Sequence, residues 1–217
     1  MKLKIYRPLK RLIITQNFTE NNACIRNDEV GRIIPRIGAN CPDGYRSVYK
    51  KFGMFGHNGL DLGAKDWEPV YASLEGTVIE LETERERGLG VGILSDNKYE
   101  WSDAFSNASG ENQIKHRYWH LAGFNVKLGD KLKIGDVIGW ADNTGLSTNT
   151  HLHFEIKPVE NGANILQNNQ MYGCIDPLAY IEPLSAIEKQ DTLAKIFLML
   201  ADISAQVQDL FLKLGKR

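Results

Sequence analysis

Short runs of β-forming residues, separated by Gly and Asp turn signals, recur between Phe55 and Ile181. Apolar, β-branched and aromatic residues dominate these runs, which is typical of strands joined by tight turns. Their number and shortness predict a mainly β, antiparallel two-sheet architecture. The polar stretch 95–115 contains Gly, Asn and Ser, and it predicts a long surface loop. The expected strands are 69–72, 76–81, 91–94, 118–121, 136–140 and 151–156.

The N-terminal segment 1–51 mixes short apolar runs with Asn, Asp, Gly and Pro. This composition predicts extended pieces and loops that pack on the main domain, which we expect to span 52–183. Cys24 and Cys41 in this segment form either a disulfide or a pair of buried free thiols. The first residues contain too short an apolar run for a classical export signal, and no run is long enough for a transmembrane helix.

The last stretch, 184–217, differs from everything before it because it contains no Gly or Pro before Gly215. Its apolar residues alternate spacings of three and four, which predicts an amphipathic α-helix. Such a helix can pack on its own domain, self-associate, dock on a partner or lie on a membrane surface. The apolar positions are Leu193, Ile196, Leu200, Ile203, Val207, Leu210 and Leu214.

Charge and cysteine content argue against a nucleic-acid binder and against a structural zinc site made of thiolates. The chain has 26 basic and 27 acidic residues, and this balance argues against a nucleic-acid partner, which needs an excess of Lys and Arg. Its three cysteines show no CxxC spacing, which argues against a thiolate zinc site.

All five histidines lie between positions 57 and 153. His151 and His153 alternate within an expected strand, so both side chains face the same side. His57 and Asp61 flank an Asn-Gly turn signal and are placed on a loop that enters a strand. Imidazole and carboxylate are the usual ligands of catalytic zinc, which takes three protein ligands and leaves one position for water. The other histidines can accept the water's proton or stabilise an oxyanion, and the spacing does not assign these roles.

Four sequence elements follow one another in a specific order. They are His-x-x-x-Asp at 57–61, an aromatic-aromatic-His-Leu run around His120, Gly-Asp-x-Leu-x-Ile-Gly-Asp-Val-Ile-Gly at 129–139, and Asn-Thr-Gly-Leu-Ser-Thr-x-x-His-Leu-His-Phe-Glu at 143–155. Together they resemble the lysostaphin/LytM zinc endopeptidases over residues 52–181. One departure is Asn149-Thr150, where family members commonly carry Gly-Pro.

The resemblance implies roles for five residues. His57, Asp61 and His153 would bind one Zn²⁺ per chain. His120 and His151 would be catalytic residues that do not bind the metal, and they would assist the water and stabilise the tetrahedral intermediate.

The resemblance also implies a fold and an activity. The fold would be a set of antiparallel sheets forming a narrow groove with zinc on its floor. The activity would be hydrolysis of peptide bonds in bacterial peptidoglycan, often at bonds that contain glycine. The expected location is therefore extracellular, periplasmic or phage-associated, for a bacterial protein exported by another route or for a phage-encoded endolysin.

Two other functions compete with this reading. The runs 68–78 and 126–139 resemble the half-motifs of biotinyl or lipoyl carriers, but neither contains the usual Met-Lys pair. A catalytically inactive relative that regulates wall hydrolases would lack one or more site residues. All five site positions are filled here, which favours an active enzyme.

Several neighbouring residues have simpler interpretations. His116 matches no element and is interpreted as a solvated loop histidine. Glu155 shares the face of His151 and His153, so it either orients a metal ligand or is a plain surface or core-edge carboxylate. For the polar turn residues we prefer turn-forming hydrogen bonds to contacts with substrate; these residues are Asn143, Thr144, Ser147 and Thr148. For Trp119 and Trp140 we prefer burial within strands to stacking on sugar rings.

Overall fold

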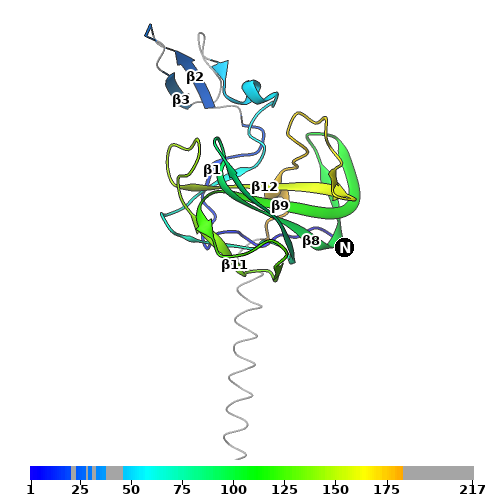
Figure 1. Cartoon of the computed structure of the whole chain (residues 1–217). Helices are drawn as coiled ribbons and strands as arrows, with labels where there is room; N and C mark the ends of the chain where they lie inside the picture. Colours follow the sequence, from blue (N-terminus) through cyan, green and yellow to red (C-terminus); the bar gives the residue numbers. More distant parts are fainter. Residues whose placement is uncertain (21–22, 28, 31–32, 38–45, 183–217) are drawn as a thin grey trace, which may run out of the picture. The chain divides into compact units, whose positions relative to one another are not determined.

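The computed structural model describes residues 1–20, 23–27, 29–30, 33–37 and 46–182 (Figure 1). The chain divides into two units, Met1–Ile181 and Glu182–Arg217. The helix predicted over 184–217, with its proposed self-association, lies outside the described residues. So does Cys41, and with it the Cys24–Cys41 pair.

The described part of the first unit is built almost entirely from strands, and every strand pair is antiparallel, which confirms the predicted mainly β class. Two 3₁₀ helices, η1 (Tyr49–Phe52) and η2 (Pro177–Ala179), are the helical elements of this part. The strands are β1 (Ile14–Gln16), β2 (Ala23–Asn27), β3 (Ile33–Ile37), β4 (Arg46–Ser47), β5 (Leu60–Gly63), β6 (Pro69–Tyr71), β7 (Gly76–Glu84), β8 (Gly88–Asp103), β9 (Ala108–Phe124), β10 (Lys131–Leu132), β11 (Val137–Ala141), β12 (His151–Glu160) and β13 (Ala163–Asn164).

Ten strands form one hydrogen-bonded network with the order β1-β5-β12-β9-β8-β7-β10. Strand β11 pairs with β6 and β9, and β13 pairs with β12. A separate sheet has the order β3-β2-β4. Backbone hydrogen bonds link all strands expected in the domain into one network. The division of that domain into two sheets therefore stays a prediction.

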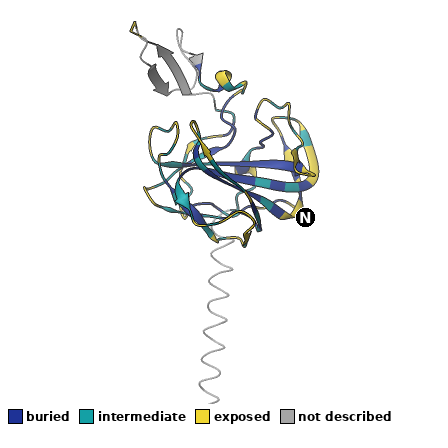
Figure 2. Ribbon diagram, in the orientation of Figure 1, coloured by how far each residue is buried: buried dark blue, intermediate teal, exposed yellow. Residues whose placement is uncertain are grey.

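The core follows the two-residue period of the central strands, which are largely dark blue in Figure 2. On β12, Leu152, Phe154 and Ile156 are fully buried, while His151 and His153 face the opposite side and are partly exposed. The N-terminal segment contributes buried Leu3 and Ile5, and its strand β1 pairs with β5. The side of the sheet opposite this core is therefore available to carry polar chemistry.

The surface loop predicted over 95–115 is wrong, because β8 and β9 continue through it and pair as far as Asp103 with Ala108. Buried Tyr99 and Trp101 alternate with exposed neighbours along β8. This two-residue period and the pairing with β9 outweigh the polar composition that suggested a loop.

His116 is likewise not a solvated loop histidine. It lies on β9 between Ile114 and Tyr118 in the two-residue period, and all three side chains are fully buried. Its Nδ1 lies 2.7 Å from the Tyr118 hydroxyl, and burial lowers the pKa of His116 to about 3. The imidazole is therefore a neutral part of the core.

Replacing Trp101 with alanine tests the hairpin that replaces the predicted loop. The indole is 5% exposed and its Nε1 donates a hydrogen bond of 3.0 Å to Asn112 Oδ1. We expect the free energy of unfolding to fall by about 3–5 kcal/mol in urea denaturation. The exposed neighbour Ser102 serves as control, because Ser102→Ala should change it by less than about 0.5 kcal/mol. Equal effects of the two changes would contradict a packed hairpin.

Candidate metal centre

Strands β5 and β12 bring three polar side chains together. Asp61 on β5 is paired directly with His153 on β12, and His57 lies on the turn that leads into β5. His57 Nε2 lies 2.8 Å from His153 Nδ1 and 3.0 Å from Asp61 Oδ1, and His153 Nδ1 lies 3.0 Å from the same oxygen. The structure thus gathers at one point the three residues expected to bind metal.

Gly59 allows this turn to approach β12 closely. A Cβ atom at this position would lie 2.5 Å from the Phe154 carbonyl oxygen and 2.9 Å from Cε1 of His153. To make room for this Cβ atom, either the backbone of β12 or the His153 ring would have to shift, and either shift would move the cluster. Glycine at position 59 is therefore required for the observed spacing.

Hydrogen bonds fix which nitrogen of His57 faces the cluster. Its Nδ1 lies 3.1 Å from the carbonyl oxygen of Asn17, which can only accept, so Nδ1 carries the proton. Nε2 is therefore the ring nitrogen that faces Asp61 and His153 and that can bind a metal ion. His153 has the opposite orientation, since its Nδ1 faces the cluster and its Nε2 lies 3.8 Å from Glu155 Oε2.

The donor set fits zinc. Two imidazole nitrogens and one carboxylate oxygen are ligands typical of a catalytic zinc site. Bonds of about 2.0–2.2 Å in a tetrahedral arrangement put ligand atoms about 3.3 Å apart. The observed separations of 2.8 to 3.0 Å need only small side-chain shifts to reach that value.

The charges in the cluster favour a cation. Burial raises the pKa of Asp61. His57 and His153 outweigh this effect through their charges and hydrogen bonds, and they hold the pKa of Asp61 well below its usual range. Burial lowers the pKa of His153, but hydrogen bonds and charges from Asp61 and Glu155 outweigh it and raise this pKa to about 9. A proton thus occupies the position where a metal ion would bind, and the ion has to displace it.

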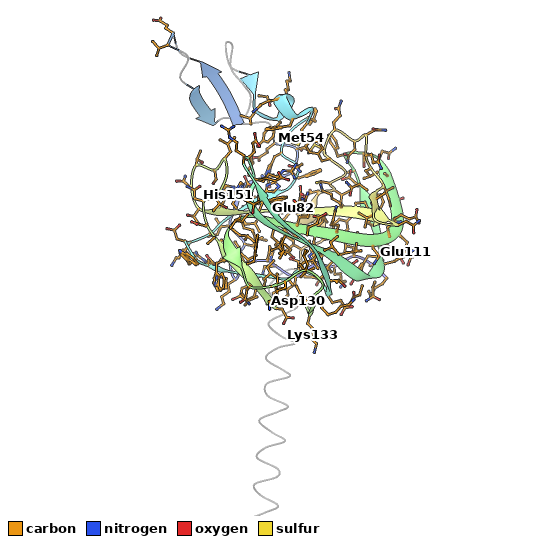
Figure 3. All side chains as sticks on the ribbon, viewed as in Figure 1. Met54, Glu82, Glu111, Asp130, Lys133 and His151 are labelled. Carbon is orange, nitrogen blue, oxygen red and sulfur yellow. The ribbon has the colours of Figure 1, made fainter. Side chains whose placement is uncertain are left out.

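His120 and His151 lie side by side next to this cluster. Their ring centroids are 4.6 Å apart, and His120 lies 6.3 Å from the His153 ring. Figure 3 labels His151 at the start of β12, and its Nε2 lies 3.6 Å from Asp61 Oδ1. The two histidines expected to act on the substrate therefore meet the three expected ligands on one side of the sheet.

Backbone carbonyls hold both rings in the same tautomer. Nδ1 of His120 lies 2.7 Å from the Thr144 carbonyl oxygen, and Nδ1 of His151 lies 2.8 Å from that of Asn149. Each Nδ1 therefore donates, and each Nε2 is left as an acceptor. Burial, followed by the charges of His151 and His153, lowers the pKa of His120 to about 4, so its ring is neutral near pH 7.

The backbone at His120 has a left-handed conformation with φ of 63°. Such a conformation costs about 1–3 kcal/mol in a residue with a side chain and persists where the surroundings enforce it. Here the amide donates to the Arg87 carbonyl oxygen at 3.3 Å, and the carbonyl accepts from the Asp142 amide at 2.9 Å. His120 lies where the register of β9 against β8 shifts between Tyr118 and Leu121, so its conformation belongs to a β-bulge within a continuous strand.

Polar residues of the turn before β12 support these histidines. Thr144 Oγ1 donates to the Leu121 carbonyl oxygen at 2.8 Å, and Ser147 Oγ donates to that of Asn149 at 2.9 Å. The bond of Ser147 lies within the turn, as the sequence predicted, whereas the bond of Thr144 ties the turn to β9. Trp119 is 1% exposed, as expected for an aromatic residue in a strand. Trp140 is only partly buried, and its ring centroid lies 6.2 Å from that of Trp67.

Glu155 is fully buried, so the interpretation as a surface carboxylate is wrong. It contacts Asn58, Arg117 and Lys157, which the sequence analysis did not single out. Lys157 follows Glu155 by two positions on the same strand, and this spacing was the available signal. Arg117 lies on another strand, where nothing local marks it.

Comparison with known proteins supplies the family. The model of the family described as Peptidase family M23 matches residues 55–166, about half of the chain. Glycyl-glycine endopeptidase ALE-1 of Staphylococcus capitis is 36% identical over 102 residues, which cover 46% of this chain and 24% of that protein. Peptidoglycan DD-endopeptidase ShyA of Vibrio cholerae is 34% identical over 100 residues, which cover 46% of this chain and 20% of that protein. The chain thus spans a quarter or less of the length of these relatives.

Among solved structures, the catalytic domain of lysostaphin from Staphylococcus simulans aligns with a TM-score of 0.45 and 26% identity. The alignment covers 58% of this chain and 78% of that domain. Within the part of the chain that the structure describes, no helix is long and apolar enough to cross a membrane.

Proposed function

Because the chain belongs to peptidase family M23, we propose that it is a zinc metalloendopeptidase that hydrolyses peptide bonds of bacterial peptidoglycan. The observation that carries this proposal is the convergence of His57, Asp61 and His153 beside two histidines whose Nδ1 atoms are held by backbone carbonyls. ALE-1 and ShyA bear the names of a glycyl-glycine and a peptidoglycan endopeptidase, which supports the substrate class.

In this proposal the three converging residues hold the metal. Bound zinc would lower the pKa of a water molecule from about 16 to about 7 and polarise the carbonyl of the bond to be cut. Asp61 contributes a negative charge, and the hydrogen bond from His57 Nδ1 to Asn17 keeps Nε2 available as a ligand.

His120 and His151 would handle protons and the developing negative charge. A neutral imidazole accepts a proton at Nε2, and a protonated one donates a hydrogen bond from it to an oxyanion. The depressed pKa of His120 keeps its ring neutral near pH 7, with Nε2 unprotonated, and we assign this ring to the proton of the attacking water. His151 directs its Nε2 toward the cluster, 3.6 Å from Asp61 Oδ1, and we assign it to the oxyanion.

Removing the metal tests this proposal. Dialysis against a chelator should reduce release of new amino groups from purified peptidoglycan to the background rate, and one equivalent of zinc should restore it. Circular dichroism before and after dialysis controls for unfolding. Hydrolysis that continues unchanged in a chain shown to be free of metal would contradict a zinc mechanism.

The main alternative is an inactive relative that regulates wall hydrolases. All five expected site residues are present and lie close together, which supports the enzyme. We further propose that the site of action is the cell wall, as the name of ShyA indicates for that relative. A chain that binds zinc and peptidoglycan but releases no amino groups would favour the regulator.

A further inference from the structure

A fully buried carboxylate lies next to the cluster formed by His57, Asp61 and His153. Glu155 is 0% exposed, and its Oε2 is 3.8 Å from Nε2 of His153, the ring nitrogen that faces away from Asp61. The same oxygen accepts a hydrogen bond of 2.6 Å from Asn58 Nδ2. Asn58 is itself buried and is the residue that follows His57. Oε2 of Glu155 thus faces the expected ligand His153 and accepts a hydrogen bond from Asn58, the residue next to the expected ligand His57.

Cations hold this carboxylate in place. Arg117 Nη1 lies 3.0 Å and Lys157 Nζ 3.4 Å from Glu155 Oε1, so the second oxygen is occupied by positive charge. Arg117 also pairs with Glu80 and Glu82, and Lys115 pairs with Glu80. Three carboxylates therefore face three cations, and this balance allows a charge to remain buried at Glu155.

We propose that Glu155 is a positioning residue for the metal site, which orients the His153 ring through Nε2 and holds the His57 turn through Asn58. A ligand imidazole that binds metal through Nδ1 carries a proton on Nε2. The Glu155 carboxylate, 3.8 Å from this nitrogen, lies beyond hydrogen-bond length but attracts the N–H by its charge and so favours this ring orientation. The amide of Asn58 extends the same control to the second ligand. This inference rests on the proposed zinc site and names the residue that sets its geometry.

Zinc affinity, measured by competition with a chromophoric chelator, tests the proposal. Glu155→Gln keeps the size of the side chain and removes its charge, and we expect zinc affinity to fall by about 10–100-fold. The matched control is Glu82→Gln, labelled in Figure 3, which also removes a carboxylate from Arg117 but touches neither Asn58 nor His153. We expect its zinc affinity to stay within about threefold of the native value.

A spectroscopic measurement separates positioning from stability. In the cobalt-substituted protein, a displaced His153 ring should change the visible absorption bands of Glu155→Gln, while Glu82→Gln should keep the native spectrum. All samples are compared at a temperature where circular dichroism shows them fully folded. Native zinc affinity together with a native cobalt spectrum in folded Glu155→Gln would overturn the proposal.

Asn58→Ala keeps the proposal testable if Glu155→Gln does not fold. It removes the link to the His57 turn and leaves Glu155 with both of its cations. We expect about a tenfold loss of zinc affinity, and an unchanged affinity would overturn the role assigned to this link. If the native chain binds no zinc, the proposed function fails. If the native chain and the variants bind it equally tightly, only the positioning role fails.

Discussion

His153→Ala should yield a folded chain that contains no zinc and hydrolyses no peptidoglycan. His153 provides one of three converging donors and contacts both of the others, at 2.8 and 3.0 Å. Loss of residues that merely support a metal ligand costs 10–100-fold in affinity, so loss of the ligand itself should cost more than about 100-fold. Metal analysis after gel filtration, together with an assay of released amino groups, measures both effects.

Val159→Ala is the matched control for this change. Val159 is 2% exposed on the same strand β12, paired with Gln113 near the strand's other end. Its truncation should lower stability without changing zinc content. Zinc at the native level in His153→Ala would show that the ion binds elsewhere and would contradict the assignment of the site.

His120→Ala should separate catalysis from metal binding. His120 donates through Nδ1 to Thr144 and is not among the three converging donors, so zinc content should remain at the native level. Loss of a general base or an oxyanion donor costs about 10²–10⁴ in rate. The expected result is therefore a zinc-loaded chain whose kcat is at least about 100-fold lower, with KM little changed.

Two outcomes would contradict this role for His120. A kcat within about threefold of the native value would show that its imidazole does not act in the reaction. Loss of zinc along with activity would show that it contributes to metal binding. Ser102→Ala, on an exposed position of β8, controls for handling of the variants.

Local spacing predicted where the central strands lie and which side chains of β12 share a face. His151 and His153 alternate with Leu152 and Phe154, so the two-residue period alone puts the histidines on one face and the apolar residues in the core. The pairing of β12 with β5, which brings Asp61 to His153, links residues about ninety positions apart. Only the resemblance to the family indicated that partnership.

The errors arose where strand pairing and burial, and not composition or motif, decided the structure. Composition suggested a loop at 95–115, whereas burial of Tyr99 and Trp101 and pairing with β9 extend the hairpin. His116 looked solvated because it matched no motif, but its place in the period of β9 directs it into the core. The cations around Glu155 come partly from a different strand, so no local pattern predicts that the carboxylate is buried with its charge balanced.

The most direct test of the central claim is the release of new amino groups from purified peptidoglycan by the native chain, with zinc per chain measured on the same sample. Walls with glycine cross-bridges and walls with direct cross-links serve as parallel substrates. We predict about one zinc per chain and release of amino groups from at least one of the two walls. A folded chain that carries one zinc and releases none from either wall would contradict the assignment as a peptidoglycan endopeptidase.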